Sequence, residues 1–128
     1  MSSRDSVSGF QTGICDIEMR TSPRHPILQR CFVHPANAPA HQPWQCIAYN
    51  ISATGIGVAL PIALPEGTVL TVRAWELPGA GPLCVQVVHT RQVHDFWFTG
   101  CEFPRLLTEA ELFVWRTGPI DWMKTTKR

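Results

Sequence analysis

Turn-forming residues interrupt this chain at short intervals, and their spacing constrains the fold more than any other feature of the sequence. Eleven prolines and nine glycines are spread over 128 residues. Proline is excluded from helix interiors and from central strands, and the cluster Pro78-Gly79-Ala80-Gly81-Pro82 can form neither element. The apolar runs between these turn signals are short, which favours strands over helices.

Six short segments between the turn signals read as strands, and the clearest shows the alternation of apolar and polar side chains that marks a half-buried strand. In one of them Leu70 and Val72 fall on one face, and Arg73 and Trp75 fall on the other. The predicted strands are residues 27–33, 44–51, 56–60, 68–76, 83–93 and 96–103. This pattern predicts an all-β fold, and closure into a barrel would leave no exposed strand edge.

One helix is predicted after the last strand. Thr108 is a suitable N-cap residue and Glu111 completes a capping box, while Leu107 and Leu112 stand at the positions of a hydrophobic staple. We expect this helix to run to about Arg116 and to stop near Gly118-Pro119, because glycine and proline commonly end helices.

The overall charge and the apolar pattern limit the possible partners and the compartment. A formal net charge of +1 argues against a basic surface for nucleic acid polymers or membranes, so an anionic ligand would need a local arginine cluster. Residues 1–20 contain no apolar run typical of a secretory signal, and no segment reaches the about 18 apolar residues of a membrane span. We therefore expect a cytoplasmic protein. The cysteines are expected to be small buried residues: Cys15, Cys31, Cys46, Cys84 and Cys101.

No arrangement of residues indicates catalysis or metal binding. The histidines share no local signature with any cysteine, and the spacing of His34, His41 and Cys46 is not that of a zinc site. No two carboxylates stand out as an acid/base pair, and Gly55-Ile56-Gly57 is not followed by a helix that could bind phosphate. We expect no enzymatic activity, no catalytic residue, no metal and no cofactor.

Two short motifs favour ligand binding instead. Arg20 and Arg24 lie on an extended, proline-containing segment, and a guanidinium can bind phosphate oxygens or the O6 and N7 edge of guanine. In the following turn, Asn50 and Ser52 offer hydrogen-bonding side chains, and Gly55 can take a positive φ and lets a flat ligand approach. Each motif alone also fits a simpler interpretation, a solvated arginine pair or an Asx-type turn.

Taken together, the two motifs resemble the PilZ domain family. The family pattern is Arg-x-x-x-Arg followed by Asp/Asn-x-Ser-x-x-Gly, and here 25 residues separate Arg24 from Asn50. The resemblance covers roughly residues 18–117, and further similar segments are Ala53–Val58, Leu64–Thr68 and Gly100–Phe103. It implies a six-stranded antiparallel PilZ-type barrel at residues 18–117 with one C-terminal helix, after a flexible N-terminal arm at 1–17 and before a basic tail at 118–128.

The resemblance also implies a bacterial receptor for the second messenger cyclic di-GMP. In that role Arg20 and Arg24 would contact phosphates and guanine, Asn50 and Ser52 would bind a guanine edge, and Gly55 would leave room for it. Met19 stands where many members carry another arginine, so binding of one ligand or of an intercalated pair stays open. Binding is expected to order the arm and to present a new surface to an unidentified downstream protein. The alternative is a PilZ-like interaction adaptor that does not bind the nucleotide.

Overall fold

The computed structural model describes residues 22–38 and 41–126, which form six strands and one helix. The elements are β1 (His25–Pro35), β2 (Trp44–Ile51), β3 (Gly55–Leu60), β4 (Val69–Ala74), β5 (Leu83–Val93), β6 (Phe96–Glu102) and α2 (Glu109–Thr126). All six predicted strands are confirmed. The bounds of β2 and β5 agree with the prediction, and the other strands differ by one or two residues at one or both ends.

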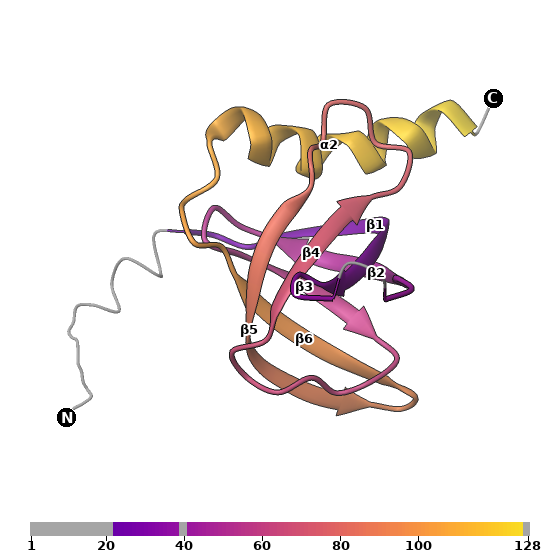
Figure 1. Ribbon diagram of the computed structural model, residues 1–128. Helices are drawn as coiled ribbons and strands as arrows, with labels where there is room; N and C mark the ends of the chain where they lie inside the picture. Colours follow the sequence, from indigo (N-terminus) through magenta and orange to yellow (C-terminus); the bar gives the residue numbers. More distant parts are fainter. Residues whose placement is uncertain (1–21, 39–40, 127–128) are drawn as a thin grey trace.

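The strands close into a barrel in the order β1-β2-β3-β6-β5-β4, and every neighbouring pair is antiparallel (Figure 1). This confirms the predicted fold class, and closure pairs every strand on both sides. The chain leaves β3 and reaches β4 through residues 61–68, where Gly67 adopts a φ of 90°. Because β3 pairs with β6, the turn that follows β2 lies beside the end of β6.

The interior of the barrel is filled by the apolar side of each strand. On β4, Leu70 and Val72 are fully buried, whereas Arg73 and the neighbouring Trp75 are exposed, as the alternation predicts. Trp44 is half-buried against the edge of this core, and its ring lies 4.8 Å from that of His41. The buried apolar residues form one continuous cluster, which also includes Trp115 from the helix.

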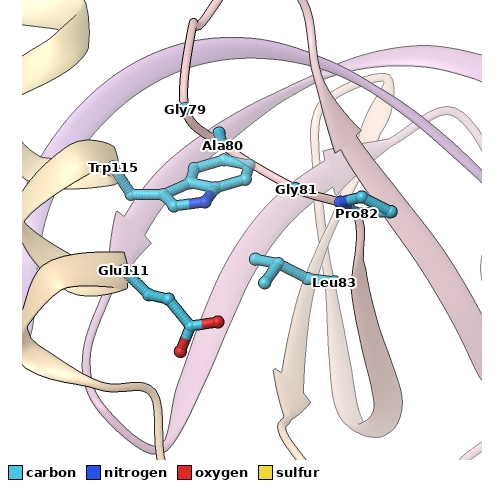
Figure 2. A pocket seen from close by; sticks show the side chains of 7 residues that line it. All are labelled: Gly79, Ala80, Gly81, Pro82, Leu83, Glu111 and Trp115. Carbon is cyan, nitrogen blue, oxygen red and sulfur yellow. The ribbon is translucent and has the colours of Figure 1, made fainter.

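Helix α2 lies across one end of the barrel and packs against β1 and β2 (Figure 1). Trp115 is 1% exposed, and its indole faces the turn that joins β4 to β5 (Figure 2). A small cavity of about 40 Å³ remains between this turn and the helix, beside Leu83 and Glu111. Phe113 on the same helix is 60% exposed. The helix therefore closes the barrel end with Trp115, and Leu112 and Val114 pack partly against the same core.

The predicted capping box is present at the start of α2. The backbone N–H of Thr108 donates to Glu111 Oε1 at 2.9 Å, and the Glu111 N–H donates to Thr108 Oγ1 at 3.1 Å. Arg105 adds two further hydrogen bonds to the Glu111 carboxylate, of 3.0 and 2.9 Å. Together the Arg105 guanidinium and the Thr108 N–H lower the pKa of Glu111 to about 2.

This carboxylate makes the attachment of α2 sensitive to acid. A carboxyl whose pKa falls on folding stabilises the folded state above its ordinary pKa, about 4.5, and that contribution is lost as the pH drops towards 2. We therefore expect Glu111→Gln to flatten the fall in melting temperature over that pH range, measured by circular dichroism. Glu109→Gln, in the same helical turn, is the control. Equal acid dependence of the parent and Glu111→Gln would contradict the assignment.

The end of α2 differs from the prediction. The helix does not stop near Gly118-Pro119 but continues to Thr126, so residues 118–126 are helical. Pro119 removes the hydrogen bond to the Trp115 carbonyl, yet a helix can tolerate one such loss. Gly118 has another role, because a Cβ at this position would clash with Leu77 Cδ1. The glycine lets the helix approach Leu77 closely.

Three cysteines, Cys31, Cys46 and Cys101, are buried as expected, but Cys84 is exposed. Cys15 lies outside the described residues. The sulfurs of Cys31 and Cys46 are 3.5 Å apart, and this contact together with burial raises the pKa of Cys46 far above that of a free thiol. Burial raises the pKa of Cys101 to about 12. The raised pKa values favour the protonated thiols of Cys46 and Cys101 at neutral pH, and the thiol is a weaker nucleophile than the thiolate.

Candidate ligand-binding site

A side-chain hydrogen bond joins the two sequence motifs. Arg24 Nη1 donates to Asn50 Oδ1 at 2.8 Å, from the residue just before β1 to the end of β2. The β1–β2 register pairs Pro26 with Asn50, and this places Arg24 beside Asn50, 26 positions away in the chain. Arg20, the other predicted arginine, lies outside the described residues.

A β-bulge in β2 directs two side chains onto β3. The bulge lies between Ala48 and Asn50, opposite Val58 and Gly57. A Cβ at Gly57 would be 2.9 Å from Asn50 Oδ1 and 2.7 Å from Tyr49 Cζ, so the absence of a side chain there allows both groups to lie on the strand. Tyr49 adjoins Asn50 in sequence, but its contact with Gly57 depends on the strand register, which the sequence motif does not reveal.

The Ser52 hydroxyl forms hydrogen bonds within its own turn. Ser52 is 1% exposed, and its Oγ accepts hydrogen bonds from the N–H groups of Thr54 and Gly55, both at 3.2 Å. The Ser52 N–H donates in turn to the Gly55 carbonyl at 2.9 Å. This is a compact ST-turn of the kind that serine favours. The contact of Ser52 with a guanine edge stays a prediction, and it would require the hydroxyl to change partners.

Gly55 is required by strand packing. Its φ is not positive; among the described glycines, positive φ occurs at Gly67 and Gly79. A Cβ on Gly55 would clash with the backbone carbonyl oxygen of Cys101 on β6. The expected left-handed conformation of Gly55 is therefore wrong. Glycine is needed at this position because β3 and β6 lie too close together for a side chain. Its proximity to a ligand stays a prediction.

The motif turn is held from a second side by the segment that leads into α2. The Phe103 N–H donates to the Thr54 carbonyl at 2.9 Å, and the Leu107 N–H donates to the Ala53 carbonyl at 2.9 Å. Two backbone hydrogen bonds from beyond β6 therefore support the turn, in addition to the bonds made by Ser52. The turn that follows Asn50 is therefore fixed to the barrel by hydrogen bonds on two sides.

Two arginines act on Tyr49, the neighbour of Asn50. Burial raises the pKa of Tyr49, while the charges of Arg24 and Arg91 act in the opposite direction. Arg24 itself is exposed, and its guanidinium uses one donor at Asn50, so further donors can reach an anion.

In the described part of the chain, no three His, Cys, Asp or Glu side chains are grouped to hold a metal ion. No helix among the described residues could cross a membrane.

Comparison with known proteins identifies the family of this chain. The family model of the PilZ domain matches residues 18–114. Among solved structures, the chain is similar to the inhibitor of motility MotI/DgrA of Bacillus subtilis, with a TM-score of 0.57 and 17% identity, over 88% of this chain and 54% of that chain. The chain thus spans about half the length of MotI/DgrA, and this likeness shows the fold alone. No protein with a curated description matches. Because the family model covers about three quarters of its residues, this chain belongs to the PilZ domain family.

Proposed function

We propose that this protein is a bacterial receptor for cyclic di-GMP that passes the signal to a partner protein and catalyses no reaction. The observation that carries the proposal is the 2.8 Å hydrogen bond between Arg24 and Asn50, which unites the two motifs in one surface site. PilZ domains are receptor or adaptor domains. A receptor for this intracellular messenger would act in the cytoplasm, which is the location we propose.

The chemistry of the pair suits a guanine nucleotide. Asn50 Oδ1 accepts from Arg24, and the two amide N–H donors of Asn50 suit acceptors such as O6 and N7 of guanine. The remaining donors of Arg24 can bind a phosphate in paired, charge-assisted hydrogen bonds. Arg20 is proposed to add a second guanidinium. Ser52 and Gly55 would then serve the ligand through the turn that positions Asn50.

The signal would pass through the segment that carries the arginines. Ser22 lies between the two, and within the described residues its buried hydroxyl has no hydrogen-bond partner. A buried polar group without a hydrogen-bond partner carries a free-energy cost. A rearrangement of this segment that gives the Ser22 hydroxyl a partner would therefore be favourable. We infer that bound nucleotide ties residues 20–24 to the barrel and thereby creates the surface that the partner protein binds.

The adaptor alternative is also favoured by specific observations. Ser52 and Gly55 are fully explained by the turn and by strand packing, so both would be needed in a barrel that binds no nucleotide. A groove of about 260 Å³ on the barrel includes the exposed rings of Trp75 and Phe96, and the Arg30 guanidinium lies 4.5 Å from the Trp75 centroid. Such a groove suits a protein partner with or without a nucleotide.

Calorimetry with cyclic di-GMP on the parent and on Arg24→Ala tests the receptor assignment. Removing one charge-assisted contact should cost about 1.5–3 kcal/mol of binding free energy, which is about tenfold to a hundredfold in Kd. The stoichiometry of the parent titration also distinguishes one ligand from an intercalated pair.

Arg73→Ala is the matched control, since Arg73 is an exposed arginine on β4 and pairs with Phe32, at the other end of β1 from Arg24. It should leave the Kd unchanged. Tight binding by the parent that survives Arg24→Ala would refute the role of Arg24. No binding by the parent would favour the adaptor.

A further inference from the structure

A row of stacked side chains continues from the motif site across the outer wall of the barrel. The Tyr49 and Phe98 rings are stacked, with centroids 4.7 Å apart and planes inclined by 29°. The guanidinium carbon of Arg91 lies 5.5 Å from the centroid of the same Phe98 ring. We call Tyr49, Phe98 and Arg91 the stacked row. Its Tyr49 end adjoins Asn50, the partner of Arg24.

The strand register explains why residues from three strands meet here. Phe98 on β6 pairs with Arg91 on β5 and with Ala59 on β3, so a small residue separates it from β2. Tyr49 reaches Phe98 across β3 because the β2 bulge turns it over Gly57. Bulges commonly redirect a side chain in this way next to functional sites.

A second bulge, in β5, lies on the opposite side of the same row. It falls between Val87 and His89, and the His89 ring lies over Gly100, where a Cβ would be 2.6 Å from His89 Cε1. Gly100 and Gly57 are Cα partners on adjacent strands. Two neighbouring glycines thus let side chains from two bulged strands approach the backbone of the wall closely. The distance from Asn50 to His89 is three strand spacings, roughly 14 Å.

We propose that Arg91 and the Tyr49–Phe98 stack form the second half of the nucleotide site and contact the guanine and phosphate that Arg24 and Asn50 do not hold. This inference rests on the proposed function. Cyclic di-GMP has two guanines and two phosphates, and the wall presents a guanidinium at each end of an aromatic pair. Arg91 can bind a phosphate or the O6 and N7 edge of guanine. The aromatic pair offers an apolar, π-rich surface to a base.

Calorimetry with cyclic di-GMP on Arg91→Ala tests the assignment. We expect the Kd to rise about tenfold to a hundredfold, as for loss of other charge-assisted contacts. Arg73→Ala is the matched control, because Arg73 is also an exposed arginine on an outer strand face but lies on β4, next to β1. It should leave the Kd within about twofold, since a distant exposed charge is screened by salt.

Tyr49 provides a second measurement because it is the only tyrosine of the chain. Its ionisation can be followed by tyrosinate absorbance with and without saturating cyclic di-GMP. A ligand on the stacked row would bury the ring and neutralise the arginine charges that lower the Tyr49 pKa, so the pKa should rise.

The outcomes separate this inference from the proposed function. If the parent does not bind cyclic di-GMP, both fail. If the parent binds and Arg24→Ala weakens binding while Arg91→Ala does not, the receptor stands and the stacked row is excluded from the site. Equal weakening in Arg91→Ala and Arg73→Ala would show a general charge effect and would overturn the role of Arg91. An unchanged Tyr49 pKa at saturating ligand would also overturn the inference.

Discussion

The Trp115→Ala variant is expected to lose about 3–5 kcal/mol of unfolding free energy, the range found when a large buried aromatic side chain is truncated. Trp115 is 1% exposed and is the largest of the fully buried side chains. It fills the barrel end between α2 and the β4–β5 turn, where a cavity of about 40 Å³ already exists (Figure 2). Truncation would enlarge this cavity and remove much of the apolar contact that holds α2. Urea denaturation followed by circular dichroism measures the loss.

Phe113→Ala on the same helix serves as its control. Phe113 is 60% exposed, so its truncation should change the unfolding free energy by no more than about 0.5 kcal/mol. Both variants replace an aromatic residue by alanine at similar helical positions, and burial is the main difference between them. If the two midpoints shift equally, the barrel does not depend on the packing of Trp115.

Gly55→Ala is expected to lower the unfolding free energy by about 3 kcal/mol or more, at the upper end of the costs of overpacking. The added Cβ would meet the carbonyl oxygen of Cys101, and a backbone atom in a paired strand cannot rotate away as a side chain can. Relief would require β3 and β6 to separate where Gly55 pairs with Glu102. The hydrogen bonds between Ser52 and Gly55 would be disturbed by the same shift.

Thermal and urea denaturation of Gly55→Ala should be compared with Gly81→Ala. A Cβ at Gly81 meets no heavy atom within 4 Å, and its φ is not positive, so that substitution should be close to neutral. The comparison also decides how Gly55 serves the motif. If Gly55→Ala keeps the parent's stability and loses only cyclic di-GMP, the glycine makes room for the ligand and the packing argument is wrong.

The parts of the fold that were predictable depend on residues close together in the chain. Three predicted features each involve residues within a few positions of one another: the alternation along β4, the short gap between the predicted strands 83–93 and 96–103, and the capping box of Thr108 and Glu111. The end of α2 was not predictable, because Gly118 packs against Leu77 from the turn between β4 and β5. Local helix-ending signals were overridden there by a tertiary contact.

The residues of the candidate site were predictable from the sequence, whereas the contacts between them were not. Arg24, Asn50, Ser52 and Gly55 were recognisable as motif residues from their order and spacing, and the all-β barrel followed from the turn pattern. That Arg24 bonds to Asn50 was decided by the β1–β2 register.

The structural roles of Ser52 and Gly55, and the stacked row at Arg91, depend on contacts between strands. The sequence by itself determined which residues carry the PilZ motifs and where the strands run. The tertiary structure decided which side chains meet, because the β3–β6 pairing joins segments about 40 residues apart whose separation in the chain says nothing of their distance in space.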